Sequence, residues 1–115
     1  MIYDRFDVVK VPFPFTDKQS TKVRPALVVS NAEFNQSVGK SVFAMITSTT
    51  RNNWLHDTVV TDLSMAGLTV PSRVRMKLFT IDNDFIIKLL GRLSDMDSMG
   101  FERNFDNLSR RSIKT

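Results

Sequence analysis

Two short, uninterrupted apolar segments restrict the fold of this chain more than any other feature. PALVV occupies residues 25–29 and VFAMI occupies residues 42–46, and both are bounded by polar residues. Five residues are too few for an independent helix, and a run that is apolar at every position is typical of a strand buried on both faces. The two segments therefore predict the centre of a β-sheet. Residues 31–40, rich in Asn, Gly and Ser, are expected to form the connection between them.

Further short strands are predicted on both sides of this pair. Residues 6–13 combine β-branched and aromatic side chains, but Pro12 and Pro14 cannot donate to a central ladder, so this strand lies at an edge or ends there. Residues 57–61 indicate another short strand. Residues 62–72 are irregular, with room for one helical turn.

The second half of the chain predicts a hairpin and a helix. Residues 73–81 alternate between apolar and polar side chains, residues 82–84 (DND) are a natural turn, and residues 85–93 fit a returning strand, although their apolar spacing also fits a helix. Ser94 and Asp97 resemble a helix N-terminal capping box. The helix that follows places three apolar side chains on one face for docking to the sheet: Phe101, Phe105 and Leu108.

The order of many short strands followed by one helix predicts a mainly β fold of the α+β class, with a small, strongly bent antiparallel sheet or barrel. A length of 115 residues, without a linker or a repeat, indicates one domain over residues 1–115.

Composition excludes several kinds of site. The chain has no cysteine and one histidine, His56, so a cysteine nucleophile, a cysteine zinc site and a pair of catalytic histidines are absent. Acidic residues are scattered and no glycine-rich phosphate loop occurs, so we expect neither a metal nor another cofactor. No apolar run is long enough for a membrane span, which together with the lack of cysteine predicts a cytoplasmic protein. The net charge of +4 is a modest excess that favours an anionic partner.

Polar residues follow the two central strands where a site can form. Arg24 precedes Pro25, and a residue before proline is held in extended geometry, which aims its guanidinium. Residues 47–50 (TSTT) present hydroxyl groups directly after the second apolar strand. If the two strands are neighbours, these groups meet at one end of the sheet. The alternative is that Arg24 is an ordinary surface cation and that TSTT is an ordinary polar turn.

Two further features carry open alternatives. Arg73, Arg75 and Lys77 form a row of positive charge on one strand face, which either follows a phosphate backbone or is a solvated face. Trp54 can stack a base, but aromatic residues in so small a chain belong mostly to the core. Residues 16–23 form a polar loop of the size of a binding flap.

Several of these segments resemble the PemK/MazF family of bacterial toxin endoribonucleases. The stretch VRPALVVS at residues 23–30, after an early D-V-V start and a polar loop, is the most specific part, and AMITST, TID and LGRLS follow in the family's order. The similarity extends over residues 6–108. It implies an SH3-like small barrel of five to seven mostly antiparallel strands with a C-terminal helix. It also implies a homodimer, and metal-independent cleavage of single-stranded RNA by attack of the 2′-hydroxyl on the neighbouring phosphorus.

The resemblance also implies roles for individual residues. The family's catalytic arginine and threonine correspond to Arg24 and Thr47. The arginine is best understood as an electrostatic clamp, since a guanidinium holds its proton too strongly for ready proton transfer. Ser48 is expected to support the phosphate. With it, the residues expected to contact RNA are Thr16, Lys22, Ser48, Thr49, Arg73, Arg75 and Lys77.

The chain departs from the family at three places. Phe6 replaces the usual glycine before D-V, the first loop lacks the histidine that some members have, and Met76-Lys77 stands where some members have an acid and glutamine. The general base is therefore left unassigned.

The expected partner is an antitoxin with an acidic, partly disordered tail, in a complex that binds DNA. The alternatives are a CcdB-like gyrase-binding toxin, whose C-terminal Trp-Gly-Ile differs from Ser-Ile-Lys-Thr here, and an RNA-binding domain without turnover.

Overall fold

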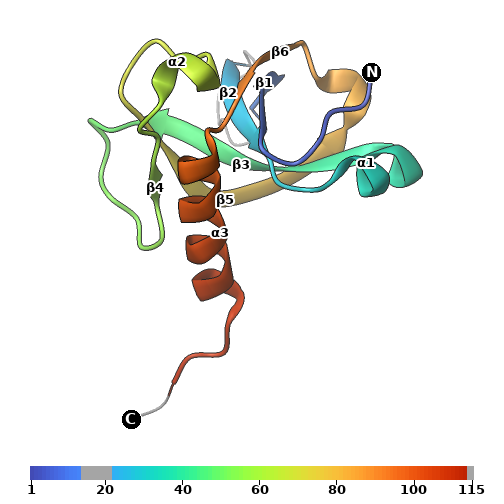
Figure 1. Cartoon of the computed structure of the whole chain (residues 1–115). Helices are drawn as coiled ribbons and strands as arrows, with labels where there is room; N and C mark the ends of the chain where they lie inside the picture. The colour runs from blue at the N-terminus through green and yellow to red at the C-terminus, as the bar shows by residue number, and fades with distance from the viewer. Residues whose placement is uncertain (14–21, 114–115) are drawn as a thin grey trace.

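A computed structural model of the chain describes residues 1–13 and 22–113, and strands make up most of its ordered elements (Figure 1). The strands are β1 (Asp7–Pro12), β2 (Val23–Val28), β3 (Lys40–Ser48), β4 (Thr58–Val59), β5 (Ser72–Asp82) and β6 (Lys88–Arg92). The helices are α1 (Ala32–Val38), α2 (Leu63–Ala66), the 3-10 turn η1 (Asn83–Phe85) and α3 (Asp95–Ser109). All strands join one antiparallel sheet in the order β4-β5-β3-β2-β1-β6. The predicted mainly β fold with a C-terminal helix is confirmed.

Alternation along the strands divides the core into two clusters on opposite faces of the sheet. One cluster packs against α3 and is centred on Phe101, which is fully buried. Its strand residues include Val8, Leu27, Ala44, Ile46 and Val74. The other cluster contains Val9, Val11, Phe13, Ala26, Val28, Phe43 and Phe79. Burial on both faces explains why the central strands are apolar at nearly every position.

The central pair of strands is as predicted. β2 and β3 are neighbours, with Ala26 opposite Met45 and Val28 opposite Phe43. β3 pairs on its other side with β5. The register of this pairing shifts between the pairs Ala44–Leu78 and Met45–Arg75. The shift keeps the predicted alternation, because Val74, Met76 and Leu78 still face one cluster.

Residues 31–40 connect β2 to β3, as predicted, but they contain the helix α1, which the sequence analysis did not predict. Asn31 caps its first turn by accepting a hydrogen bond from the Phe34 amide at 2.9 Å, and Gly39 ends it in the left-handed conformation at φ 79°. Asn35 is fully buried and donates to the backbone oxygens of Tyr3 and Ser30. Tertiary hydrogen bonds therefore stabilise a short segment whose composition is typical of a loop.

The predicted hairpin of residues 73–93 is wrong in its pairing. β6 is a strand, but it pairs with β1 and not with β5. The turn η1 turns the chain away from β5, and Gly91 then lies against α2. A Cβ atom at Gly91 would lie 2.3 Å from the Met65 carbonyl oxygen, so this crossing requires glycine.

The remaining strand and turn predictions are mostly confirmed. β1 ends at Pro12, as expected, although it lies between β2 and β6 and is not an edge strand. Pro14 lies outside the described residues. The strand expected over residues 57–61 shortens to β4, and the expected helical turn after it is α2.

Helix α3 docks through the predicted face near its start. Ser94 accepts a hydrogen bond from the Asp97 amide at 3.1 Å, which confirms the N-terminal cap. Phe101 and Phe105 pack on the sheet, whereas Leu108 is 42% exposed. Phe6 adopts φ 76°, the conformation that glycine accepts readily, and its ring meets the Phe101 ring edge-on at 6.2 Å.

The carboxylate of Asp97 ties the start of α3 to the segment before α2. It accepts hydrogen bonds from the Thr61 amide at 3.0 Å, the Thr61 hydroxyl at 2.7 Å and the Asp62 amide at 3.1 Å. Burial alone raises the pKa of this carboxyl, but the hydrogen bonds from Thr61 and Asp62 outweigh it and hold the pKa below its ordinary value.

We expect Asp97→Asn to lower the free energy of unfolding by about 1–3 kcal/mol at neutral pH, because buried donors lose a charged acceptor. Since the folded pKa is depressed, the stabilisation is complete above the unfolded value of about 4 and is lost as the pH falls through the folded pKa. Urea unfolding of the two proteins between neutral pH and about pH 2 measures this. The gap between their midpoints should narrow below about pH 4, and a constant gap would contradict the assigned hydrogen bonds.

Candidate functional site

The ends of β2 and β3 bring two of the predicted site residues to the same part of the sheet. The last residue pair between β2 and β3 at this end of the sheet is Ala26 with Met45. Because the strands are antiparallel, the first residues of β2 and the last residues of β3 both lie beyond this pair. Arg24 lies two residues beyond Ala26, and Thr47 lies two residues beyond Met45. Both therefore point to the face of the sheet opposite α3. The sequence analysis expected the two residues to meet if the two strands are neighbours, and this condition is met.

Arg24 carries a guanidinium without an anionic partner in the described part of the chain. Its side chain is half-buried and lies over the Phe13 ring, whose centroid is 5.7 Å from the guanidinium carbon. No hydrogen bond or ion pair engages it among residues 1–13 and 22–113. An aromatic ring beside a cation orients it without neutralising it.

Thr47 is the second polar residue at this end of the sheet. The residue is only 7% exposed, and it pairs through its backbone with Arg73 of β5. Within the described residues, its hydroxyl makes no hydrogen bond. A sheet end that offers one cation and one hydroxyl donor can bind an oxyanion.

The residues after Thr47 form an ordered turn. The Ser48 hydroxyl lies 3.0 Å from the Thr50 hydroxyl and accepts from the Thr50 amide at 3.2 Å. The Thr49 amide donates to the Pro71 carbonyl oxygen at 3.1 Å. These bonds hold the hydroxyl groups of the turn beside the end of β3.

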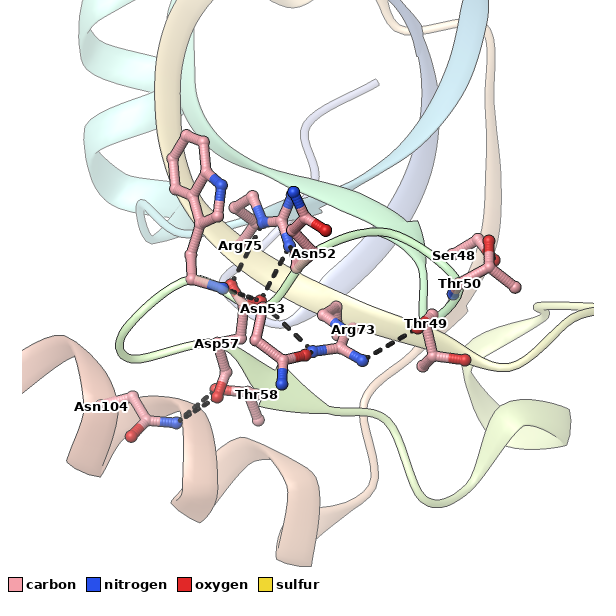
Figure 2. Close-up of polar contacts among 11 residues, drawn as sticks. Ser48, Thr49, Thr50, Asn52, Asn53, Asp57, Thr58, Arg73, Arg75 and Asn104 are labelled. Atoms are coloured by element: carbon pink, nitrogen blue, oxygen red, sulfur yellow. Dashed lines mark hydrogen bonds and ion pairs between the residues drawn. The ribbon is translucent and has the colours of Figure 1, made fainter.

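Arg73 and Arg75 of the predicted basic row bind acceptors within the protein (Figure 2). Arg75 is 6% exposed and donates to the Asp57 carboxylate through Nε at 3.3 Å and through a terminal nitrogen at 3.0 Å. The terminal nitrogen also donates to the Asn52 carbonyl oxygen. Arg73 lies 3.6 Å from the same carboxylate, and it donates to the Asn53 side chain and to the Thr49 carbonyl oxygen.

Arg73 and Arg75 therefore do not form an exposed row of positive charge on β5. Residues 49–57 fold over Arg73 and Arg75 and supply their acceptors, so the interpretation as a solvated face is equally wrong for these two. Lys77 is half-buried and also has an interaction partner. A contact of any of the three with RNA stays a prediction. Two guanidiniums against one carboxylate leave one positive charge in excess next to Thr47.

Asp57 is the residue that the sequence analysis missed. Its partners lie 16 and 18 positions away on another strand, and no spacing rule connects them. The neighbouring His56 has φ 71° and is half-buried. Of the predicted loop contacts, Lys22 is exposed immediately before β2, and Thr16 lies outside the described residues.

Two further observations concern metals and membranes. Among the described residues, no three acidic or histidine side chains gather where they could hold a metal ion. Within residues 1–13 and 22–113, no helix has both the length and the apolar character needed to span a bilayer.

Comparison with known proteins identifies the fold and the family. Residues 4–106 match the family described as "PemK-like, MazF-like toxin of type II toxin-antitoxin system". No curated protein sequence matches the chain.

Solved structures share the fold at low sequence identity. MazF from Deinococcus radiodurans has a TM-score of 0.73 at 19% identity, over 94% of this chain and 96% of that one. Toxin MazF-mt6 of Mycobacterium tuberculosis has a TM-score of 0.72 at 19% identity, over 88% and 93%. A mycobacterial endoribonuclease in complex with its cognate antitoxin has a TM-score of 0.72 at 17% identity, over 91% and 92%. The family match extends over most of the chain, and the chain therefore belongs to the PemK-like, MazF-like toxins of type II toxin-antitoxin systems.

Proposed function

We propose that this toxin is a metal-independent endoribonuclease that cleaves single-stranded RNA, with Arg24 and Thr47 at the reacting phosphate. One observation carries the proposal: both residues lie at one end and on one face of the paired strands β2 and β3, and neither polar group makes a hydrogen bond or an ion pair within the described residues. A site that is already ordered but unpaired needs little reorganisation to receive an anion.

The reaction is an internal transesterification. The 2′-hydroxyl attacks the adjacent phosphorus and loses its proton, while the bond from phosphorus to the 5′ oxygen breaks and that oxygen gains a proton. The products are a 2′,3′-cyclic phosphate and a free 5′-hydroxyl, and no water is consumed. Negative charge grows on the non-bridging oxygens during attack, so a fixed guanidinium and a hydroxyl donor stabilise the transition state more than the ground state.

Arg24 suits this role better than the two arginines of β5. Arg73 and Arg75 already bind Asp57 and backbone carbonyl groups, and these contacts must break before either guanidinium can hold a phosphate in a bidentate way. Arg24 has no such competing partner among the described residues. Ser48 and Thr49 follow Thr47 and support the phosphate from the turn.

The partners proposed for the toxin are its RNA substrate, a second copy of the chain and a cognate antitoxin. Solved relatives include an endoribonuclease in complex with its cognate antitoxin and a MazE-MazF complex. The net charge of +4 favours an acidic antitoxin segment that competes with RNA for the site. One toxin domain over residues 1–115 and a cytoplasmic location complete the proposal.

Incubation of the purified toxin with a mixed RNA pool in EDTA tests the activity, with the new ends mapped. We expect cuts that leave 2′,3′-cyclic phosphate and 5′-hydroxyl ends. Binding without cuts would instead indicate an RNA-binding domain without turnover. Inhibition of gyrase with intact RNA would indicate a CcdB-like toxin.

A further inference from the structure

Trp54 is the single tryptophan of the chain, and it lies outside both hydrophobic clusters. The residue is 46% exposed, within the segment 49–57 that folds over β5. Its ring lies over the Arg75 guanidinium, with 4.8 Å between the ring centroid and the guanidinium carbon. Arg75 is itself buried, so one face of the indole is covered by a fixed cation while much of the side chain stays accessible.

The backbone around Trp54 is fixed as well. The Trp54 amide donates to the Asp57 carboxylate at 2.9 Å, and the Asp57 amide donates to the Trp54 carbonyl oxygen at 3.1 Å. Asn104 of α3 donates to the Asp57 carbonyl oxygen at 3.2 Å, which joins this turn to the helix (Figure 2). The side chain is therefore presented on a rigid support, and little conformational entropy is lost when a ligand binds to it.

The position of Trp54 relates it to the proposed site. Arg75 pairs with Met45, and Met45 pairs on its other side with Ala26, two residues from Arg24. Strands are about 4.8 Å apart and residues about 3.4 Å apart, so the backbones at Arg24 and Arg75 are roughly 12 Å from each other. Single-stranded RNA that occupies a site of about 4 nucleotides or more can reach both.

We propose that the accessible side of Trp54 is a stacking site for one nucleobase of the single-stranded RNA, a few nucleotides from the phosphate held by Arg24. The inference rests on the proposed function and adds a base-binding position to it. Every base has a π-face, so the site tolerates different bases and contributes affinity more than sequence choice. The excess positive charge of the Arg73, Arg75 and Asp57 cluster attracts the flanking phosphates.

The sole tryptophan makes the test direct, because its emission reports on this position alone. The probe is a mixed-sequence oligonucleotide of about 12 nucleotides, within the range of site sizes for such proteins, with 2′-O-methyl riboses that prevent attack. A second probe has the same length and backbone but no bases. We expect base-dependent quenching of Trp54, and binding by Trp54→Ala about tenfold weaker by fluorescence anisotropy of a labelled probe. Trp54→Phe should retain most of the affinity, since a ring remains.

Phe85→Ala is the matched control. Phe85 is an exposed aromatic residue in η1, at the opposite end of β5 from Ser72, and its loss should leave binding unchanged. Thermal unfolding of each variant identifies any that is not folded. Equal quenching by both probes, or equal binding by Trp54→Ala and the wild type, would overturn the stacking site.

A parallel cleavage assay separates this inference from the proposed function. Cuts in RNA without base-dependent quenching leave the nuclease standing and remove the stacking site. Base-dependent quenching without any cut leaves the stacking site standing and removes the nuclease.

Discussion

Arg24→Ala is expected to lower kcat/KM for RNA cleavage by about 100- to 1000-fold while the protein stays folded. The reason is electrostatic: the guanidinium meets charge that develops on the phosphate only as the 2′-oxygen approaches, so its loss raises the barrier. Folding should persist because Arg24 is half-buried and makes no hydrogen bond within the described residues. Initial rates on a labelled RNA that contains a mapped cut site give this ratio, and the midpoint of urea unfolding confirms the fold.

Two further variants serve as comparisons for the cleavage rate of Arg24→Ala. Arg24→Lys keeps the charge but loses the planar fork, so its activity should lie between those of the wild type and the alanine variant. Lys40→Ala removes an exposed cation at the far end of β3 and should leave cleavage unchanged. Arg24→Ala with wild-type rates would remove Arg24 from the site.

The same assay applies to Thr47, whose hydroxyl is the second donor of the proposed site. Thr47→Val conserves the shape of the side chain at a position that is 7% exposed and removes the donor, so cleavage should fall with little change in stability. Thr47→Ser restores the hydroxyl and should recover most of the activity. Equal rates for the valine and serine variants would show that the hydroxyl has no part in the reaction.

Asp57→Ala is expected to lower the free energy of unfolding by about 3–5 kcal/mol, the usual effect of breaking a buried ion pair. The Asp57 side chain is 6% exposed and the Arg75 side chain 7%, so loss of the carboxylate leaves two guanidiniums near one another without an anion. Urea unfolding measures the change. Because β5 carries Arg73 opposite Thr47, we also expect cleavage to fall.

A surface ion pair supplies the matched control. Asp82 pairs with Lys40, and their side chains are 48% and 51% exposed, so Asp82→Ala should cost less than about 1 kcal/mol. Adding Arg75→Met to Asp57→Ala should recover part of the lost stability, since it removes one uncompensated charge. Equal midpoints for Asp57→Ala and Asp82→Ala would contradict the role given to the cluster.

These variants also distinguish two kinds of basic residue that look alike in the sequence. Arg24 and Arg75 both lie on strands and on the same face of the sheet. The first has no acidic partner within the described residues, whereas the second is covered by the segment 49–57. The distinction depends on where Asp57 comes to lie, which the sequence does not show.

Local patterns were sufficient for several elements. The apolar runs located β2 and β3, the alternation of residues 73–81 located β5, and the Ser94 cap located the start of α3. In each case the signal lies within a few consecutive residues, because strand alternation and helix capping depend on near neighbours along the chain. Asn31 and Gly39 were caps of the same local kind for α1, and the loop-like composition between them hid that signal.

The sequence by itself determined the fold class, the family resemblance and the pair Arg24 and Thr47 as the residues to test. Only the tertiary structure decided that β6 pairs with β1, that Asp57 binds Arg73 and Arg75, and that Trp54 lies on a buried cation. The physical reason is range. Burial periodicity and capping are encoded over a few residues, whereas strand order and ion pairing join residues far apart, and their free energy depends on the whole packed chain.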